Sequence, residues 1–276
     1  MICLKNIKYY IANKLYSSNI AKIIPGYFRK KILKKENICF IPTILSELPK
    51  DNHPVLSNIE NQKKTIKKFN ETQKEVTAKT YPDLIDLLKE FYSKDKEITF
   101  LDFGGEQIDQ YLILKKEFKN IKYYVFNLKQ VNEDLDTLKK IYNYKNLYIL
   151  KEIHEIQNHT YDFINFGSVL QYIDNYSDIL KKILPTCNKH VLVSAVHLYK
   201  DQILDYKNIV KQTNLWPRNI HLFFFEFDAF VKIFLNERFQ ITFEKKNLTH
   251  DINYNNFSLV NLNKIKYTDI LFEKII

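Results

Sequence analysis

Glycine is scarce in this chain: only four occur among 276 residues. Three of them, Gly104, Gly105 and Gly167, directly follow or end runs of apolar residues with high β propensity. Glycine adopts positive φ without steric cost and lets a ligand approach the backbone closely. A strand that breaks into a glycine turn and then a helix is typical of a βα loop that cradles a phosphate or a nucleoside. The sequence therefore predicts a nucleotide-type ligand site at these turns.

From about residue 96 onward the pattern alternates between short apolar runs and amphipathic segments. Strands separated by single helices favour a parallel sheet covered on both faces, so we expect an α/β, Rossmann-like domain. The late segments predict an antiparallel strand pair that closes this sheet. The expected strands are 97–103, 121–126, 147–150, 161–166, 190–196, 238–246 and 267–273, and the expected helices are 107–119, 131–142, 175–184, a polar helix after about 200, and 226–237.

The first part of the chain differs in composition from the rest. Nine of the 42 Lys and Arg residues lie in residues 1–35, which contain no Asp or Glu, and the remaining residues carry 33 basic and 32 acidic side chains. We therefore divide the chain into a basic helical arm and connector (1–54), a helical lid or cap (55–93) and a Rossmann-like domain (94–276). The arm is either a solvated face of small helices or a contact to an anionic membrane or a partner protein. A near-neutral body gives no reason to expect nucleic acid as a partner.

The first motif is Leu101-Asp102-Phe103-Gly104-Gly105-Glu106, at the end of the first expected strand of the sheet. It lacks the Gly-Lys-Ser/Thr of a P-loop and the GxGxxG of a dinucleotide fingerprint. An acidic residue before the glycines disfavours a pyrophosphate and suits a ligand that carries an amino group or a sulfonium. This reasoning favours S-adenosylmethionine over NAD, and the alternative is a plain βα turn that uses glycine for packing.

The second motif, Ser168-Val169-Leu170-Gln171-Tyr172, follows Gly167 at the end of the fourth expected strand. Ser168, Gln171 and Tyr172 are polar residues in an otherwise apolar stretch, and in a doubly wound sheet the loop after this strand lies at the ligand-binding edge. Two interpretations stay open: these side chains face a ligand, or Ser168 caps a turn while Tyr172 packs against the sheet.

Together the two motifs resemble a family of S-adenosylmethionine-dependent methyltransferases that bacterial gene clusters for surface polysaccharides encode. The resemblance covers roughly residues 80–275. It implies a class I methyltransferase fold and S-adenosylmethionine as cofactor. We expect Asp102, Gly104, Gly105, Asn127, Ser168 and Gln171 to hold this cofactor, with a contribution from Glu106. The resemblance also implies O-methylation of a sugar, a nucleotide-linked sugar or a phosphate-type substituent of a capsule or surface polysaccharide.

Two positions depart from the family pattern. Glu106 stands where the family continues its glycine run, and Asn127 stands where methyltransferases usually place an acid that binds the ribose hydroxyls. Asparagine accepts a hydroxyl hydrogen bond without the charge-assisted strength of a carboxylate. These departures keep open a catalytically degenerate binding or scaffold module in glycan assembly. A dehydrogenase or nucleotide-sugar enzyme is a second alternative, which the absence of GxGxxG disfavours.

Candidates for a general base are few. His197, just past the fifth expected strand, is the leading one, and Tyr172 and Asp174 are secondary; for His197 a packing role without chemistry is the alternative. His154 and His159 are five residues apart, which turns them away from a common helical face, so we expect no metal there.

Compartment and partners follow from what the sequence lacks. Three scattered cysteines without a CxxC pair fit a reducing compartment, and no run approaches the length of a membrane span. We expect a cytoplasmic protein, peripheral at the inner membrane face if the arm contacts lipid. Its partner is a small-molecule or glycan-precursor acceptor.

Overall fold

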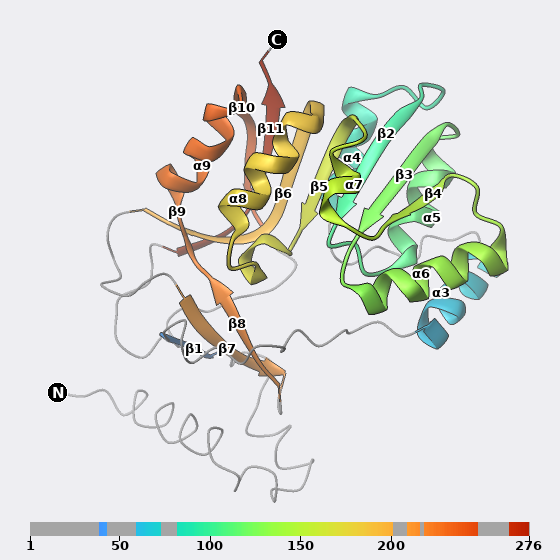
Figure 1. Cartoon of the computed structure of the whole chain (residues 1–276), viewed down its shortest axis with the longest axis horizontal. Helices are drawn as coiled ribbons and strands as arrows, with labels where there is room; N and C mark the ends of the chain where they lie inside the picture. The colour runs from blue at the N-terminus through green and yellow to red at the C-terminus, as the bar shows by residue number, and fades with distance from the viewer. Residues whose placement is uncertain are drawn as a thin grey trace, which may run out of the picture.

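The computed structural model describes residues 39–42, 59–72, 82–200, 209–215, 218–247 and 265–275. The arm expected at residues 1–35 lies outside these ranges. Within them an eight-stranded sheet has the order β10-β11-β6-β5-β2-β3-β4, with β9 paired to β6 (Figure 1). The strands are β2 (Ile98–Phe103), β3 (Ile121–Phe126), β4 (Leu147–Leu150), β5 (Tyr161–Gly167), β6 (Cys187–Tyr199), β9 (Phe225–Glu226), β10 (Phe239–Lys246) and β11 (Ile265–Lys274).

The strand directions confirm the expected fold class. The neighbours from β4 through β6 pair in parallel, whereas β11 runs antiparallel to both β6 and β10. A parallel sheet closed by one late antiparallel hairpin is the class I methyltransferase arrangement. The strand order reverses between β2 and β5, so the carboxyl ends of these two strands form the crevice in which such sheets bind ligands.

Helices cover both faces of the sheet, as its buried strands require. They are α3 (Ile59–Thr72), α4 (Pro82–Phe91), α5 (Ile108–Glu117), α6 (Lys129–Tyr142), α7 (Ile153–Ile156), α8 (Tyr176–Ile183) and α9 (Phe227–Asn236), with 3-10 turns η3 (Leu170–Tyr172) and η4 (Leu184–Thr186). One hydrophobic core contains residues of α3 to α6, and the other contains residues of α7 to α9. None of the described helices combines the length and the apolarity needed to cross a bilayer.

The segment expected to form a lid contributes to the core. Ile66 of α3 and Leu88 of α4 are both 0% exposed and belong to the same hydrophobic cluster as the sheet residue Phe100. The apolar stripes of the two helices therefore pack against the domain. A role as a lid stays a prediction, since packing against the core neither requires nor excludes it.

A second, three-stranded antiparallel sheet was not expected. It has the order β1-β7-β8, with β1 at Cys39–Pro42, β7 at Ile209–Leu215 and β8 at Arg218–Phe223. The expectation of a polar helix after residue 200 was wrong for residues 209–215, because these residues pair as a strand with β8 and with the distant β1. Strand β8 contacts η3, so this sheet stands beside the second motif.

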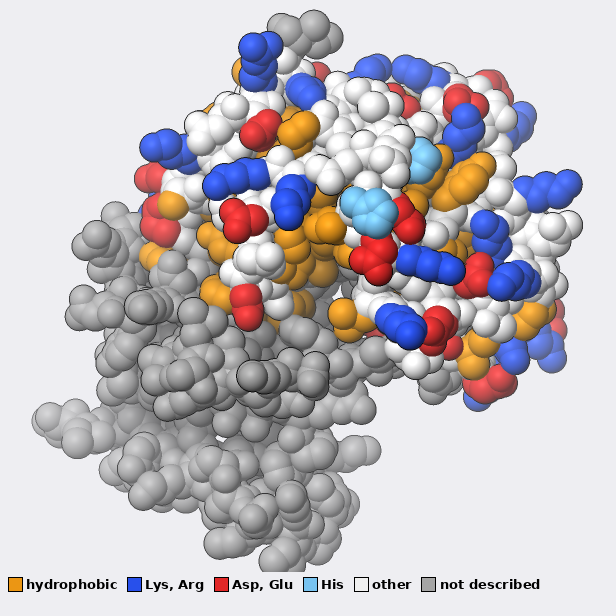
Figure 2. All heavy atoms as spheres, viewed as in Figure 1, with side chains coloured by type: hydrophobic (Ala, Val, Ile, Leu, Met, Phe, Trp, Pro, Cys, Tyr) orange, Lys and Arg blue, Asp and Glu red, His pale blue; other side chains and the backbone are white. Residues whose placement is uncertain are grey.

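Strand β6 is longer than the sequence predicted. It runs to Tyr199 because β11 pairs with it as far as the Ile265↔Tyr199 partners, and β9 pairs with its last two residues. His197 therefore lies inside the strand and not just past its end. The surface of the described part intermingles basic and acidic side chains on the face in Figure 2, in keeping with a near-neutral body.

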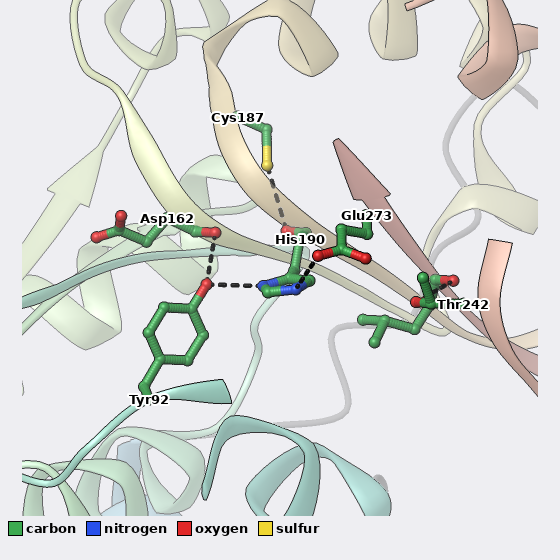
Figure 3. A network of polar contacts seen from close by, with 7 residues as sticks. Tyr92, Asp162, Cys187, His190, Thr242 and Glu273 are labelled. Atoms are coloured by element: carbon green, nitrogen blue, oxygen red, sulfur yellow. Dashed lines mark hydrogen bonds and ion pairs between the residues drawn. The ribbon is translucent and has the colours of Figure 1, made fainter. Parts of the chain in front are cut away.

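A buried polar cluster joins the segment after α4 to β5 and β6 (Figure 3). The Tyr92 hydroxyl lies 3.0 Å from the Asp162 carbonyl oxygen and 2.9 Å from His190 Nδ1. The carbonyl can only accept, so the Tyr92 hydroxyl donates its hydrogen bond to the Asp162 carbonyl, and Nδ1 of a neutral His190 then donates to the Tyr92 oxygen. The other ring nitrogen, Nε2, is buried without a hydrogen-bond partner and lies 3.8 Å from the Glu273 carboxylate. Burial lowers the pKa of His190, and Glu273 opposes this effect.

We expect His190 to make stability depend on pH. Because the unfolded histidine binds a proton more readily than the buried one, the free energy of unfolding should fall as pH drops through about 6.5. His190→Asn removes this titration and should reduce the slope of the free energy of unfolding between pH 7 and 5, measured by denaturant unfolding, while buried His197 continues to contribute. His154→Asn, a change at an exposed histidine, is the control. Equal slopes for wild type and His190→Asn would contradict the assignment.

Candidate functional site

Asp102 is a buried carboxylate at the carboxyl end of the central strand β2. It is 4% exposed and accepts hydrogen bonds from the Tyr123 hydroxyl on β3 and from Asn165 Nδ2 on β5, the latter at 2.9 Å. Desolvation raises its pKa to about 6, and hydrogen bonds from Tyr123, Asn165 and Gln110 oppose this rise. The carboxylate therefore remains mostly charged at pH 7 and ties the three central strands together directly below the glycine turn. Direct contact of Asp102 with a cofactor stays a prediction.

The glycine turn is packed between the two motifs. Gly104 has φ of 84°, and a Cβ added there would lie 2.5 Å from Val169 Cγ2 of the second motif. A Cβ added at Gly105 would lie 2.1 Å from Asp102 Oδ2. Both distances are far below van der Waals contact, so each position needs glycine. The two motifs, some 60 residues apart in sequence, are thus in direct contact at the crevice between β2 and β5.

Asn127 follows β3 and holds the glycine turn. Its Nδ2 donates to the Gly105 carbonyl at 2.9 Å, while its Oδ1 accepts from the Leu128 backbone N–H at 2.7 Å. A carboxylate at this position has no proton to donate and would face the carbonyl oxygen with like partial charge. The departure from an acid therefore has a structural reason. The half-exposed Asn127 and the half-exposed Gly105 remain at the surface of the crevice.

Gln62 of α3 is a positioning residue that sequence reasoning missed. Its Oε1 accepts from the backbone N–H of Ile108, the first residue of α5, at 3.1 Å, and its Nε2 lies 3.4 Å from the Glu106 carbonyl. The side chain, 3% exposed, takes the place of an N-cap for α5. A separation of 46 residues in sequence gave no signal for this contact. The backbone of Glu106 is thus held from α3, and its side chain is half-exposed.

The second motif forms a tight, hydrogen-bonded loop. Ser168 has φ of 53°, and its backbone N–H donates to the Ser194 carbonyl on β6 at 2.9 Å. Gln171 is 1% exposed, and its Nε2 donates to Ser168 Oγ at 2.8 Å and to the Ala195 carbonyl at 3.1 Å. Burial raises the pKa of the Tyr172 phenol, and hydrogen bonds from Gln171 and Ser168 oppose this rise. Asp174 is exposed just beyond η3.

His197 lies in an aromatic enclosure. It is 3% exposed, and its ring lies 4.9 Å from the ring centroids of both Phe224 and Tyr267. Burial lowers its pKa to about 3, which keeps the ring neutral at pH 7 and makes it a weak proton acceptor. The structure thus favours the packing interpretation of His197 over catalysis, and its role as a base stays a prediction. Within the described residues no group of three or more His, Cys, Asp or Glu side chains could hold a metal ion.

The contact between Asn127 and Gly105 predicts an unusual response to substitution. Although an acid is the usual residue at this position in methyltransferases, Asn127→Asp should destabilise the protein by about 1 kcal/mol and weaken binding at the crevice, because the donor to the Gly105 carbonyl is lost. Denaturant unfolding and calorimetric titration with S-adenosylhomocysteine measure the two effects. Asn120→Asp removes an exposed donor to the Asp95 carbonyl at the opposite, amino-terminal end of β3, and should leave ligand affinity unchanged. Tighter ligand binding by Asn127→Asp would contradict this view of the site.

Comparison with known proteins supports the fold. No family model and no curated protein matches this sequence. Among solved structures, the chain is similar to a protein assigned as a sarcosine dimethylglycine methyltransferase from Galdieria sulphuraria, with TM-score 0.51 and 10% identity over 69% of this chain and 82% of that one. An S-adenosylmethionine-dependent methyltransferase from Clostridium acetobutylicum ATCC 824 aligns with TM-score 0.49 and 11% identity over 79% of this chain and 99% of that one. Magnesium protoporphyrin IX methyltransferase from Synechocystis PCC 6803 aligns with TM-score 0.48 and 11% identity over 71% and 82% of the two chains. The chain has the fold of class I S-adenosylmethionine-dependent methyltransferases.

Proposed function

We propose that this protein is an S-adenosylmethionine-dependent methyltransferase. The observation that carries the proposal is the packing of the two motifs at the strand-order reversal: Gly104 contacts Val169, and Gly105 lies on the buried Asp102 carboxylate. Packing against Val169 and Asp102 explains why both positions need glycine, and the half-exposed backbone of this turn, above a negative charge, suits a ligand with a positively charged end.

The residues present fit such a cofactor. Gly104 and Gly105 supply a turn that no other residue could form, and Asn127 and Ser168 border it from the ends of β3 and β5. When bound, S-adenosylmethionine supplies a methyl group on a sulfonium. An acceptor oxygen would receive this methyl group and release its proton to water, and the electron pair of the broken carbon–sulfur bond would remain on sulfur. The chain's contribution is to hold donor and acceptor in line and to exclude water.

We place the acceptor near the carboxyl end of β6. A cavity of about 220 Å³ lies there, between β6, α9, β10 and β11. The Lys200 ammonium lies 4.2 Å from the centroid of the Phe227 ring, and the Lys266 ammonium lies 3.9 Å from the Glu244 carboxylate. The residues that line this cavity are Leu198, Tyr199, Lys200, Phe227, Glu244, Lys266 and Thr268.

Two ammonium groups against one carboxylate, next to an aromatic ring, suit an anionic acceptor with a ring that can stack. These features support a phosphorylated or nucleotide-linked sugar, the class that the resemblance to surface-polysaccharide methyltransferases implies. O-methylation in capsule or surface-polysaccharide biosynthesis is accordingly part of this proposal. So is a cytoplasmic location, with residues 1–35 as a contact to the inner membrane face.

Thermal unfolding tests the cofactor assignment. S-adenosylhomocysteine at 100 times its dissociation constant should stabilise the native state by about 2.7 kcal/mol and raise the Tm by about 5 °C, because it binds only the folded chain. NAD and ATP at equal concentrations are the controls and should have no effect. No shift at millimolar S-adenosylhomocysteine would reject the proposal and favour the degenerate binding module.

Methyl transfer to paired acceptors tests the acceptor class. A sugar phosphate should accept the methyl group with a lower KM than the same sugar without phosphate. Lys200→Gln should raise the KM for the phosphorylated acceptor about tenfold, since a hydrogen bond to a charged group is worth roughly 1.5–3 kcal/mol. Lys181→Gln, an exposed lysine on α8, is the matched control. Equal KM values for both acceptors in wild type would exclude an anionic acceptor.

A further inference from the structure

One peptide unit of β6 connects the second motif to a buried acid on the neighbouring strand. The Ser194 carbonyl accepts from the Ser168 backbone N–H at 2.9 Å, and the Ala195 N–H donates to Asp269 Oδ1 at 2.7 Å. This C=O and this N–H belong to the same peptide bond, which is planar and rigid. The position of the Asp269 carboxylate therefore sets the direction in which the Ser194 carbonyl meets the second motif.

The backbone at this connection needs an external restraint. Ala195 has φ of 59° and Ser168 has φ of 53°, and both residues carry a Cβ that disfavours the left-handed region. The pairing of β11 with β6 is irregular between Thr268 and Ile270, and Asp269 stands at this irregularity. A residue in a sparsely populated conformation persists only when its surroundings hold it there. Asp269 supplies that restraint to Ala195 through its N–H.

The carbonyl of Ala195 extends the connection to Gln171. Gln171 Nε2 donates to that carbonyl at 3.1 Å and to Ser168 Oγ at 2.8 Å, and the Gln171 side chain is 1% exposed. The two groups of Ala195 therefore link Asp269 on one side to the second motif on the other. Rotation of the backbone at residue 195 would therefore break two contacts together: the bond from the Ser168 N–H to the Ser194 carbonyl and the bond from Gln171 to the Ala195 carbonyl.

Asp269 is itself fixed by a neighbour on the segment after β10. Asn247 Nδ2 lies 2.8 Å and 2.9 Å from the two oxygens of Asp269, and the Asn247 N–H donates to the Tyr267 carbonyl at 2.8 Å. Asp269 is 4% exposed and Asn247 is 2% exposed. A carboxylate fits here because it accepts from both the Ala195 N–H and the Asn247 amide, whereas an asparagine would turn a donor toward one of them.

We infer that Asp269 is a positioning residue for ligand binding at the second motif, acting through the peptide unit of Ser194 and Ala195. This inference rests on the proposed function, since the loop that Asp269 holds borders the proposed cofactor site. Asp269 does not need to touch the cofactor. It fixes the backbone of Ser168 and the buried side chain of Gln171, and so holds the loop that borders the proposed cofactor site.

The test exchanges the two members of the buried pair. Asp269→Asn should place an amide donor against the Asn247 amide and weaken S-adenosylhomocysteine binding roughly 10- to 100-fold, since a buried donor left without an acceptor has a cost of this size. The double variant Asp269→Asn/Asn247→Asp restores a donor opposite an acceptor and leaves the new amide oxygen at position 269 to accept from Ala195. It should recover an affinity within about threefold of wild type. Calorimetric titration gives the dissociation constants.

Hydrogen exchange of the peptide that contains residues 167–173 supplies a readout independent of ligand. This segment should exchange faster in Asp269→Asn than in wild type and return to the wild-type rate in the double variant. Asp178→Asn, a change at an exposed acid on α8, is the matched control and should alter neither property.

The outcomes separate the two hypotheses. Absence of ligand binding by wild type would reject the proposed function, while the exchange rates would still test the connection between Asp269 and the loop. Wild-type affinity and wild-type exchange in a folded Asp269→Asn variant would overturn the positioning role. An equal loss of S-adenosylhomocysteine affinity in the single and the double variant, both with wild-type Tm, would also overturn the positioning role. Ligand binding would then not depend on the hydrogen-bond pattern between residues 247 and 269.

Discussion

The hydrogen bonds to the buried Asp102 carboxylate are the interactions on which the rest of the structure depends. It lies at the end of the central strand, and its hydrogen bonds reach Tyr123 on one neighbouring strand and Asn165 on the other. A charge in this position is costly unless it is hydrogen-bonded, so its donors fix the ends of three strands relative to one another. Gly105 packs directly on this carboxylate, so the shape of the crevice follows from the same contact.

Each turn at the crevice is held by side chains from elsewhere in the chain. Asn127 holds the glycine turn, Gln62 holds the start of α5, and Asp269 holds the peptide unit that meets the second motif. All three side chains form hydrogen bonds to backbone groups, so they fix the course of the chain itself at each turn. Such restraint by a second set of residues is what keeps a binding site in a productive geometry. The departure from an acid at position 127 therefore fits a built site better than a decayed one.

The sequence predicted most strands of the large sheet but missed the features that depend on pairing between distant parts of the chain. Alternating apolar runs and helices located β2 to β6 and the closing pair of β10 and β11, because period-2 and period-3.6 patterns report burial directly. The small sheet of β1, β7 and β8 escaped prediction, since pairing between residues 39–42 and 209–215 leaves no local trace. The end of β6 was misplaced for the same reason: β9 and β11 extend it by long-range pairing.

By itself the sequence determined the fold class and the two motifs, because hydrophobic period and the need for glycine are local properties. It also placed Gly104 and Gly105 at a turn, because glycine directly after a strand is typical of a βα loop. Only the tertiary structure decided what these motifs contact. It showed that Asp102 is enclosed by donors, that His197 lies among aromatic rings and that Asp269 bonds to the β6 peptide unit that contacts the second motif. Those relations depend on strand register and strand order, which residues close in sequence do not encode.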